Sequence, residues 1–223
     1  MTICIIPARG GSKRIPRKNI KAFCGKPMLA RAIATAQASK LFEQIIVTTD
    51  DDEIADIASQ NGANVIQRPT ELADDYATTV AVIRHAIQGL EGNICCLYPC
   101  TPLLQPSDLT QSFAHWQQSQ SLYCFPVLEF ESNILRALKL DETGNVASVF
   151  GEHEQMRTQD LPHAYYDAGQ FYWGKAEAWR NEDKIHNHAT AFVLPKYRVV
   201  DIDDDADWQF AERLYAMQYL HKV

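Results

Sequence analysis

Residues 7–19 read Pro-Ala-Arg-Gly-Gly-Ser-Lys-Arg-Ile-Pro-Arg-Lys-Asn, between a short apolar run at 3–6 and a helical pattern that follows. Gly10 and Gly11 let backbone amides approach an anion without a Cβ in the way, and consecutive amides in such a turn form an anion-binding concavity. Five cations surround these glycines. Residues 1–42 hold nine Lys and Arg and no Asp or Glu, although the whole chain has a formal charge of -7. The stretch therefore predicts a loop that wraps the phosphates of a nucleoside triphosphate.

A solvated basic surface turn is the alternative interpretation of this loop, because most charge clusters are of that kind. Two Gly and two Pro among the cations fix an unusual backbone path, and the loop follows the first apolar strand, where open α/β sheets bind ligands. Both features favour phosphate binding. The chain contains neither Gly-x-x-x-x-Gly-Lys-[Ser/Thr] nor Gly-x-Gly-x-x-Gly, so P-loop hydrolases and dinucleotide-binding domains lose their main support.

The composition indicates a globular protein with a small polyanionic ligand. A chain of 223 residues that is 46% hydrophobic can bury the core of one domain. It has no apolar stretch of membrane-spanning length and no signal-peptide pattern, so we expect a cytoplasmic protein without a membrane partner. The excess of 28 Asp and Glu over 21 Lys and Arg disfavours nucleic acid as a partner. We interpret the six cysteines as structural, with Cys100 the one doubtful case.

Strands and helices alternate along most of the chain. This alternation predicts an α/β fold with a mainly parallel sheet, flanked by helices and connected by right-handed crossovers. The expected strands are at 3–6, 45–49, 64–66, 94–98 and 121–127, and the expected helices at 27–40, 51–61, 79–89 and 107–118.

The pattern changes after the strand at 121–127. We expect a single domain over 1–223 with an extended excursion at 129–165, built around a hairpin turn at 141–145, that serves as a lid or a dimerisation arm. The chain then returns with the strands 171–173 and 191–194, an extended run at 198–203 and a last helix from about 205 to 221.

Asp201 and Asp203 flank Ile202, so on an extended backbone both carboxylates point to the same side. Two carboxylates at the end of an apolar run provide the hard oxygen ligands that Mg2+ requires beside a triphosphate. The alternative is that the acidic run 203–205 only caps the last helix. We expect both: Asp204 or Asp205 caps the helix, while Asp201 and Asp203 bind one or two Mg2+ ions.

The motifs resemble a known family over nearly the whole chain. The stretch 7–19, together with Thr-Thr-Asp at 48–50, Arg-Pro-Thr-Glu-Leu-Ala at 68–73 and Asp-Ile-Asp at 201–203, is similar to the cytidylyltransferases that activate nonulosonic acids. The resemblance implies a Rossmann-like sheet of the nucleotide-diphospho-sugar transferase type. It also implies CTP as a substrate, Mg2+ as a cofactor at Asp201 and Asp203, and a homodimer.

The resemblance assigns a nucleotide site to the loop and to positions beyond it. Arg9 and Lys18 match the family residues that hold the triphosphate, and we predict them to be catalytic. Asn19, Arg68, Ala77 and Thr79 match positions around ribose and cytosine. The complete predicted nucleotide site is Ala8, Arg9, Gly10, Gly11, Ser12, Lys13, Lys18, Asn19, Arg68, Ala77 and Thr79.

The sugar side departs from the sialic acid branch of the family. The segments Tyr-Pro-Cys-Thr-Pro at 98–102 and Tyr-Asp-Ala-Gly at 166–169 replace that branch's Gln-Pro-Thr-Ser-Pro and Arg-Pro-Asn-Gly, and 157–162 with 166–173 is similar to the pseudaminic acid cytidylyltransferases. Aromatic rings provide apolar platforms for a sugar, although a core aromatic cluster explains some of them. The predicted sugar-binding residues are Tyr98, Arg157, Tyr166, Asp167, Gln170 and Tyr172, with Arg157 on the sugar carboxylate.

The implied reaction is an attack of the C2 anomeric hydroxyl of an acidic nine-carbon sugar on the α-phosphorus of CTP, which expels pyrophosphate. His163, Asp167 and a metal-bound water remain alternative bases. The alternatives to pseudaminic acid are sialic, legionaminic and deoxyoctulosonic acid. A nucleotide-sugar glycosyltransferase and a non-catalytic nucleotide-binding protein are the other function classes.

Overall fold

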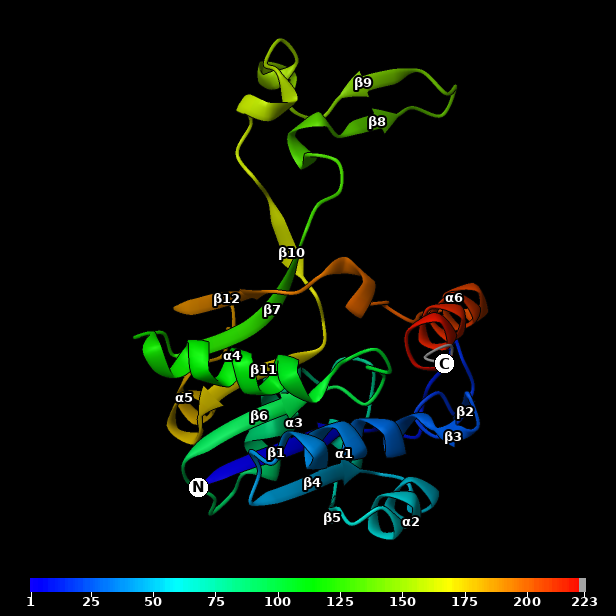
Figure 1. Cartoon of the computed structure of the whole chain (residues 1–223), viewed down its shortest axis with the longest axis vertical. Helices are drawn as coiled ribbons and strands as arrows, with labels where there is room; N and C mark the ends of the chain where they lie inside the picture. Colours follow the sequence, from blue (N-terminus) through cyan, green and yellow to red (C-terminus); the bar gives the residue numbers. More distant parts are fainter. Residues whose placement is uncertain (221–223) are drawn as a thin grey trace.

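The computed structural model describes residues 1–220 and centres on one eight-stranded, mainly parallel sheet (Figure 1). Its strands are β1 (Thr2–Pro7), β4 (Gln44–Thr49), β5 (Asn64–Gln67), β6 (Asn93–Leu97), β7 (Tyr123–Glu129), β10 (Tyr165–Asp167), β11 (Phe171–Lys175) and β12 (Ala189–Val193). Their order is β10-β7-β11-β6-β1-β4-β5, with β12 paired to β7. β1 runs parallel to both β4 and β6, whereas β11 is antiparallel to β6 and β7. The loop after β1 therefore leaves the middle of the sheet.

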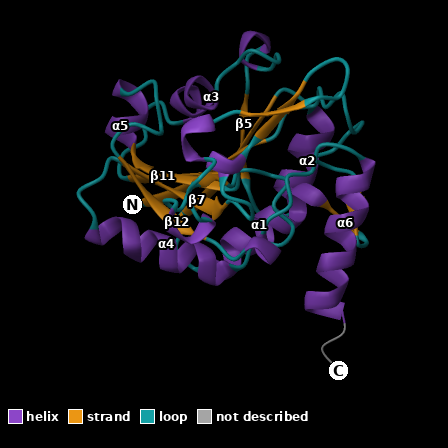
Figure 2. Ribbon diagram, turned by 90° about the horizontal axis from the view of Figure 1, so that it is seen from above, coloured by secondary structure: helices purple, strands orange, loops and turns teal. Residues whose placement is uncertain are grey.

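Helices cover both faces of the sheet (Figure 2). One face packs on α1 (Met28–Ser39), α2 (Asp52–Gln60) and α4 (Pro106–Gln118), and the other on α3 (Thr79–Ala86) and α5 (Ala176–Asn181). Successive residues of β1 alternate between the faces: Cys4 and Ile6 join the first core, Ile3 and Ile5 the second. Burial on both faces explains why this strand is apolar throughout.

A third apolar cluster fixes the C-terminal helix beside the loop at 7–19. The helix α6 (Asp205–Tyr215) continues as a π-helical turn over Ala216–Leu220. Its Trp208 packs edge-on against Phe23 of the short hairpin β2 (Ala22–Phe23) and β3 (Lys26–Pro27), with ring centroids 5.4 Å apart. Ile15 of the loop and Ile202 are buried in the same cluster. Burial of Ile202 holds its neighbours next to the loop.

Residues 130–164 leave the sheet between β7 and β10 and stand away from the body as an arm (Figure 1). At its end β8 (Leu138–Leu140) and β9 (Val146–Ser148) pair as a hairpin. The Asp141 carboxylate accepts the backbone amides of Thr143 and Asn145 at 2.9 Å, which fixes the predicted turn. Short 3-10 helices connect other elements of the chain. They are η1 (Thr70–Leu72), η2 (Ile134–Arg136), η3 (Gly151–His153), η4 (Thr158–Asp160) and η5 (Lys196–Arg198).

The predicted α/β class and the predicted strands and helices of the body are confirmed, with ends shifted by a few residues. Three features were not predicted: the β2–β3 hairpin, β10 and α5. The run at 198–203 forms no strand, because it begins in a 3-10 turn, and Val200 and Ile202 pack on the third cluster while Val199 packs on the first. The predicted end of the last helix at residue 221 lies outside the described residues.

Candidate functional site

The loop at 7–19 is anchored to the start of α2. Asp51 caps that helix by accepting the amide of Ile54 at 3.0 Å, and its carboxylate also accepts two hydrogen bonds from Arg17, which adopts a left-handed backbone with φ of 56°. The Gly10 amide donates to Asp50 Oδ1 at 3.0 Å. A Cβ on Gly10 would lie 2.6 Å from Asp51 Oδ2, so a side chain there would displace the carboxylate that caps α2. The loop's path thus depends on the residues that follow β4.

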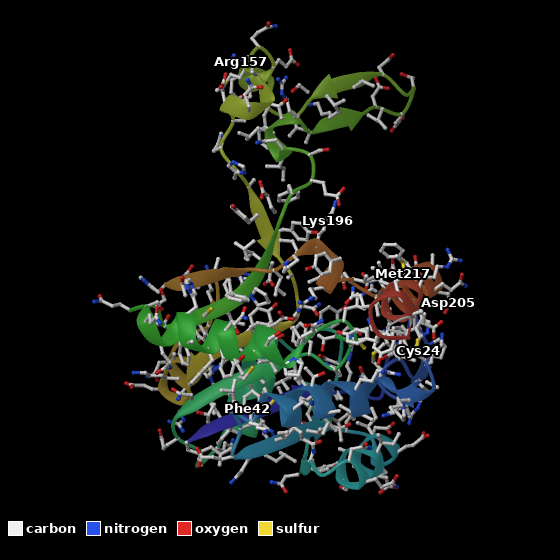
Figure 3. All side chains as sticks on the ribbon, in the orientation of Figure 1. Cys24, Phe42, Arg157, Lys196, Asp205 and Met217 are labelled. Carbon is white, nitrogen blue, oxygen red and sulfur yellow. The ribbon has the colours of Figure 1, made fainter. Side chains whose placement is uncertain are left out.

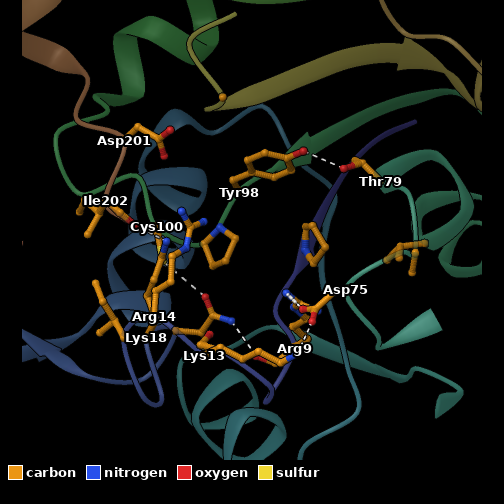
Figure 4. Close-up of a pocket in the computed structure, with 18 of the residues that line it drawn as sticks. Arg9, Lys13, Arg14, Lys18, Asp75, Thr79, Tyr98, Cys100, Asp201 and Ile202 are labelled. Carbon is orange, nitrogen blue, oxygen red and sulfur yellow. Dashed lines mark hydrogen bonds and ion pairs between the residues drawn. The ribbon is translucent and has the colours of Figure 1, made fainter. Parts of the chain in front are cut away.

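The loop forms one side of a cavity of about 520 Å3 at the carboxyl ends of β1 and β6 (Figure 4). The remaining sides come from the segment after β5, the start of α3, the segment after β6, the turn before β11 and residues 200–202. Open α/β sheets bind their ligands at this edge. The lining residues are Pro7, Arg9, Ser12, Lys13, Arg14, Ile15, Lys18, Asn19, Arg68, Leu72, Asp74, Asp75, Ala77, Thr79, Val82, Tyr98, Pro99, Cys100, Gly169, Gln170, Val200, Asp201 and Ile202.

Four cations, Arg9, Lys13, Arg14 and Lys18, form what we call the basic wall of the cavity (Figure 4). Arg14 Nη1 lies 2.6 Å from Asp203 Oδ2. Lys18 donates its ammonium to the carbonyl of Ile202 and lies 4.0 Å from the same carboxylate. Each cation therefore has an acidic or carbonyl partner from a distant part of the chain.

Arg9 and Lys13 share one acidic partner. Arg9 Nη2 lies 2.8 Å from Asp75 Oδ1 and Nη1 donates to the carbonyl of Asp74 at 2.6 Å, while Lys13 pairs with the other oxygen of Asp75. These two cations lower the pKa of Asp75, Lys13 more than Arg9. Asp75 is therefore held ionised inside the cavity lining.

Arg68 and Asn19 lie at the buried floor of the cavity. Arg68 is only 5% exposed, and burial lowers the pKa of its guanidinium. Its Nη2 donates to the Thr48 carbonyl at 2.6 Å, but its Nε has no hydrogen-bond partner within residues 1–220. A buried donor without an acceptor is costly. Asn19 donates its amide to the Arg9 carbonyl at 2.8 Å and accepts from the Cys100 thiol at 3.4 Å.

Tyr98 lies across the cavity from the cations (Figure 4). Its ring centroid is 5.4 Å from that of Tyr172, and we call the two rings the aromatic wall. The Tyr98 and Thr79 hydroxyls are 2.7 Å apart, and burial raises the pKa of Tyr98 to about 12. Tyr172, 5% exposed, donates to both oxygens of Asp167 at 3.1 and 3.0 Å, and His186 contacts the same carboxylate at 2.9 Å. Burial also raises the pKa of Tyr172, so both hydroxyls stay protonated at neutral pH.

Asp201 and Asp203 suit a magnesium ion in their chemistry. Partial desolvation raises the pKa of Asp201, and the charge of Asp203 raises it further, so the pair is close enough to repel. Within residues 1–220 no group of three or more metal-ligating side chains is present. Mg2+ is commonly held by one or two carboxylates, with phosphate oxygens and waters completing its shell. Two aspartates at the rim of a basic cavity fit that pattern.

The structure brings most of the predicted site residues together. Eleven of them line the cavity: Arg9, Ser12, Lys13, Lys18, Asn19, Arg68, Ala77, Thr79, Tyr98, Gln170 and Asp201. The other predicted residues of the loop, Ala8, Gly10 and Gly11, are not among the lining residues, and Ala8 is fully buried. Asp203 faces Arg14 at the rim.

Four residues predicted to bind the sugar lie outside the lining. Tyr172 is in the second core, and Asp167 is held by Tyr172 and His186. Tyr166 is exposed at the base of the arm, where it packs on Phe130. Arg157 lies at the far end of the arm, with its guanidinium bound by Asp160 (Figure 3). The structure does not bring Arg157 to this cavity, because the arm points away from the body.

Sequence reasoning missed the acidic partners of the basic wall. Asp75 pairs with Arg9 and Lys13, and Asp74 accepts from Arg9 through its carbonyl, but exposed loop aspartates carry no local pattern that distinguishes a contact from solvation. The available signal was position: Asp74 and Asp75 directly precede Ala77 and Thr79, which were already assigned to the nucleotide.

Taken together, the cavity joins a cluster of cations, a buried unpartnered guanidinium nitrogen and two rim carboxylates. It is suited to a ligand with several phosphates at one end and a polar ring at the other. Within residues 1–220 no helix has both the length and the apolar character needed to cross a bilayer.

Comparisons with known proteins agree with this geometry. The sequence model described as "Cytidylyltransferase" matches residues 3–222. The chain is 44% identical to the pseudaminic acid cytidylyltransferase of Campylobacter jejuni strain 81-176, over 97% of each chain. It is 29% identical to the N-acylneuraminate cytidylyltransferase of Escherichia coli strain RS218, over 99% of this chain and 54% of that protein.

Among solved structures, a CMP:2-keto-3-deoxy-manno-octonic acid synthetase complexed with CTP matches with a TM-score of 0.73 and 14% identity, over 97% of this chain and 99% of that one. At this identity the likeness establishes the shared Rossmann-like fold, as the sequence motifs predicted.

Proposed function

Because the chain belongs to the cytidylyltransferase family, we propose that it transfers CMP from CTP to pseudaminic acid and releases pyrophosphate. The main support for pseudaminic acid as the sugar is the 44% identity, over 97% of both chains, to an enzyme named for that acid. The substitutions at 98–102 and 166–169, which separate this chain from the sialic acid branch, support the same choice.

The C2 hydroxyl oxygen of the sugar forms a bond to the α-phosphorus while the bond from that phosphorus to the bridging oxygen breaks, and pyrophosphate leaves. Arg9 and Lys18 hold the triphosphate and offset the charge that develops on it. The buried Arg68 Nε donates to an oxygen of the nucleoside, and Asn19 keeps the loop closed through the Arg9 carbonyl. Positioning supplies much of the rate, because both substrates are held in one cavity.

Asp201 and Asp203 would hold Mg2+ against the phosphates. When bound, the ion supplies positive charge that stabilises the phosphates of CTP. Neither side-chain base considered from the sequence lies in the lining: His163 pairs with Glu129 at the base of the arm, and Asp167 is bound by Tyr172 and His186. The proton of the sugar hydroxyl therefore leaves to water in this proposal.

Pyrophosphate release from CTP and Mg2+, measured with purified pseudaminic, sialic, legionaminic and deoxyoctulosonic acids, tests the function. We expect turnover with pseudaminic acid to exceed turnover with the others at least about tenfold, which corresponds to about 1.4 kcal/mol of discrimination. Turnover with another acid but none with pseudaminic acid would overturn the substrate. No release with any acid would favour a binding protein.

We further propose that the chain is a single domain over 1–223 that forms a homodimer through its arm. Leu138, Leu140 and Val146 of the hairpin are 64%, 72% and 59% exposed, and a row of apolar side chains on an exposed hairpin is more stable when covered. In a dimer, Arg157 at the end of the arm would reach the sugar carboxylate in the partner's cavity.

Mixing two inactive variants tests that arrangement. If Arg157 acts across the dimer, mixing Lys18→Ala with Arg157→Ala after mild dissociation restores one intact site in each mixed dimer. If it acts within its own protomer, every mixed site carries one defect and activity stays lost. A monomer at micromolar concentration in light scattering would refute the dimer itself.

A further inference from the structure

The segment 73–77, between η1 and α3, lies across the basic wall. Asp75 places one carboxylate oxygen 2.8 Å from Arg9 Nη2 and its other oxygen on the Lys13 ammonium. The Asp74 carbonyl accepts from Arg9 as well, at 2.6 Å. A carbonyl and a bidentate carboxylate thus occupy donors that a phosphate would use, in the manner of neighbouring phosphate oxygens.

The segment is shaped by its own backbone and is not embedded in the core. The Asp74 carboxylate accepts the amides of Tyr76 and Ala77 at 2.9 and 2.7 Å, which makes a self-contained turn. Tyr76 at its tip is 90% exposed, and no residue from 73 to 77 belongs to an apolar cluster. Contacts with Arg9 and Lys13 are therefore the main tie between this turn and the loop.

These contacts compete with a polyphosphate for the same two cations. Arg9 and Lys13 each direct a charged group to the same carboxylate, and a ligand that spans both with two phosphates needs the donors that Asp75 holds. The ion pairs involve groups that are 34–79% exposed, so each is weak enough to be exchanged. Because one carboxylate spans both cations with its two oxygens, a single phosphate can span them too, but a polyphosphate brings more negative charge and more oxygens to the two cations than a single phosphate does.

We propose that Asp75 is a specificity-determining residue that competes with phosphate groups for Arg9 and Lys13, and so weakens the binding of CTP and pyrophosphate more than the binding of CMP. The proposal rests on the proposed function, since it concerns the same cavity. In turnover, Asp75 pairs with Arg9 and Lys13 again as pyrophosphate leaves. This competition lowers the affinity for the product and therefore reduces product inhibition. The carboxylate weakens substrate binding and in exchange speeds product release.

The test is calorimetric binding of inorganic pyrophosphate, CTP and CMP, at fixed Mg2+ and ionic strength, to the wild type and to Asp75→Asn. We expect pyrophosphate and CTP to bind about three- to tenfold more tightly to the variant, the size expected for removing two exposed ion pairs, and CMP to gain less than either. The inhibition constant of pyrophosphate in turnover should fall by the same factor.

Glu71→Gln is the matched control. It removes one negative charge from the same connection, and Glu71 is exposed and makes no ion pair within residues 1–220. Equal pyrophosphate affinity in the two variants, or a gain for CMP equal to the gain for pyrophosphate, would overturn the proposal. Either result would mean that the loss of one negative charge, and not the position of Asp75, changes the affinity. Thermal denaturation of each variant establishes that the fold is retained.

Failure of this inference and failure of the proposed function are distinguishable. Pyrophosphate binding is measured without any sugar, so tighter binding to Asp75→Asn supports the inference even if pseudaminic acid is not turned over. Normal turnover with pseudaminic acid, together with an unchanged pyrophosphate affinity in Asp75→Asn, would support the proposed function and refute the competition by Asp75.

Discussion

The basic wall and the aromatic wall face each other across one cavity and are built in opposite ways. The cations Arg9, Lys13, Arg14 and Lys18 are close in sequence, and all but Lys18 are more than one third exposed in the ion pairs they form. Tyr172 behind the aromatic wall is buried, and its hydroxyl is bound at fixed geometry. Exposed ion pairs contribute little to stability, whereas removing a partner from a buried hydrogen bond costs more. The basic wall can therefore exchange its partners for a ligand, while the aromatic wall keeps a fixed shape.

Lys18→Ala should give the largest change of the variants considered, a loss of kcat, because it removes the least exposed cation of the basic wall, which is 22% exposed. We expect kcat to fall about 10²- to 10³-fold, the usual cost of losing one charge-stabilising donor from an active site. The melting temperature should change little. Steady-state pyrophosphate release and thermal denaturation measure both quantities.

Lys26→Ala is the control for that variant. Lys26 lies exposed on β3, outside the cavity lining, and makes no ion pair within residues 1–220. A similar loss of kcat in both variants would mean that net charge, and not the position of Lys18, supports turnover.

The sequence predicts the basic wall better than it predicts the aromatic wall. Three of the four cations of the basic wall, Arg9, Lys13 and Lys18, belong to the predicted nucleotide site, because a contiguous loop at the end of a strand leaves its side chains few other places to go, whereas Arg14 was not assigned to that site. The aromatic wall was predicted only in outline. The alternation of β11 separated Tyr172 from Phe171 and Trp173, but both faces of the sheet are buried, so alternation could not show which side faces a ligand.

Residues far from the loop were the hardest to place. Asp75 contacts Arg9 through a turn whose position depends on η1 and the start of α3, and no periodicity encodes that approach. Arg157 was assigned to the sugar by resemblance, but the direction of the arm is a tertiary property. The sequence therefore predicts contiguous chemistry well and long-range charge partners poorly.

Asp51→Ala tests the anchor of the basic wall and should have the next largest effect. Asp51 both caps α2 and accepts from Arg17, so we expect a loss of about 1–2 kcal/mol in the free energy of unfolding, the upper part of the range for an N-cap. Urea denaturation at pH 7 measures it. Asp56→Ala, on the exposed side of the same helix, is the control and should stay within about 0.5 kcal/mol.

The pH dependence of that loss follows from the pKa of Asp51. The Arg17 guanidinium lowers the pKa of this carboxyl below its unfolded value of about 3.9. A group with a lowered folded pKa stabilises the protein above its unfolded pKa, and that stabilisation disappears as pH falls through the folded pKa. The difference between wild type and Asp51→Ala should stay constant from about pH 5 to 8 and shrink below about pH 4. A difference that grows in acid would contradict the ion pair.

Tyr172→Phe tests the fixed character of the aromatic wall. The change removes the hydroxyl that donates to Asp167, and we expect a loss of about 1 kcal/mol in the free energy of unfolding. This loss should be the same at low and high salt, whereas the KM for CTP should rise with salt because the basic wall is screened. Tyr166→Phe, on an exposed ring, should change neither the free energy of unfolding nor the KM for CTP. A salt-dependent loss for Tyr172→Phe would remove the distinction between the walls.

Cys100 lies where the two walls meet and should show the smallest effect of all. Its thiol lines the cavity and donates to Asn19, which suggests a reactive position, but burial raises its pKa to about 12. The thiolate is the reactive form, so only about one thiol in 10⁴ is ionised at pH 8. Iodoacetamide at pH 7.5 should therefore leave activity unchanged while the same treatment modifies a free thiol such as glutathione, and mass spectrometry of the peptide containing Cys100 should find no adduct. Rapid inactivation that CTP prevents, and that Cys100→Ser abolishes, would show that the thiol is ionised by the basic wall and that the two walls are not electrostatically independent.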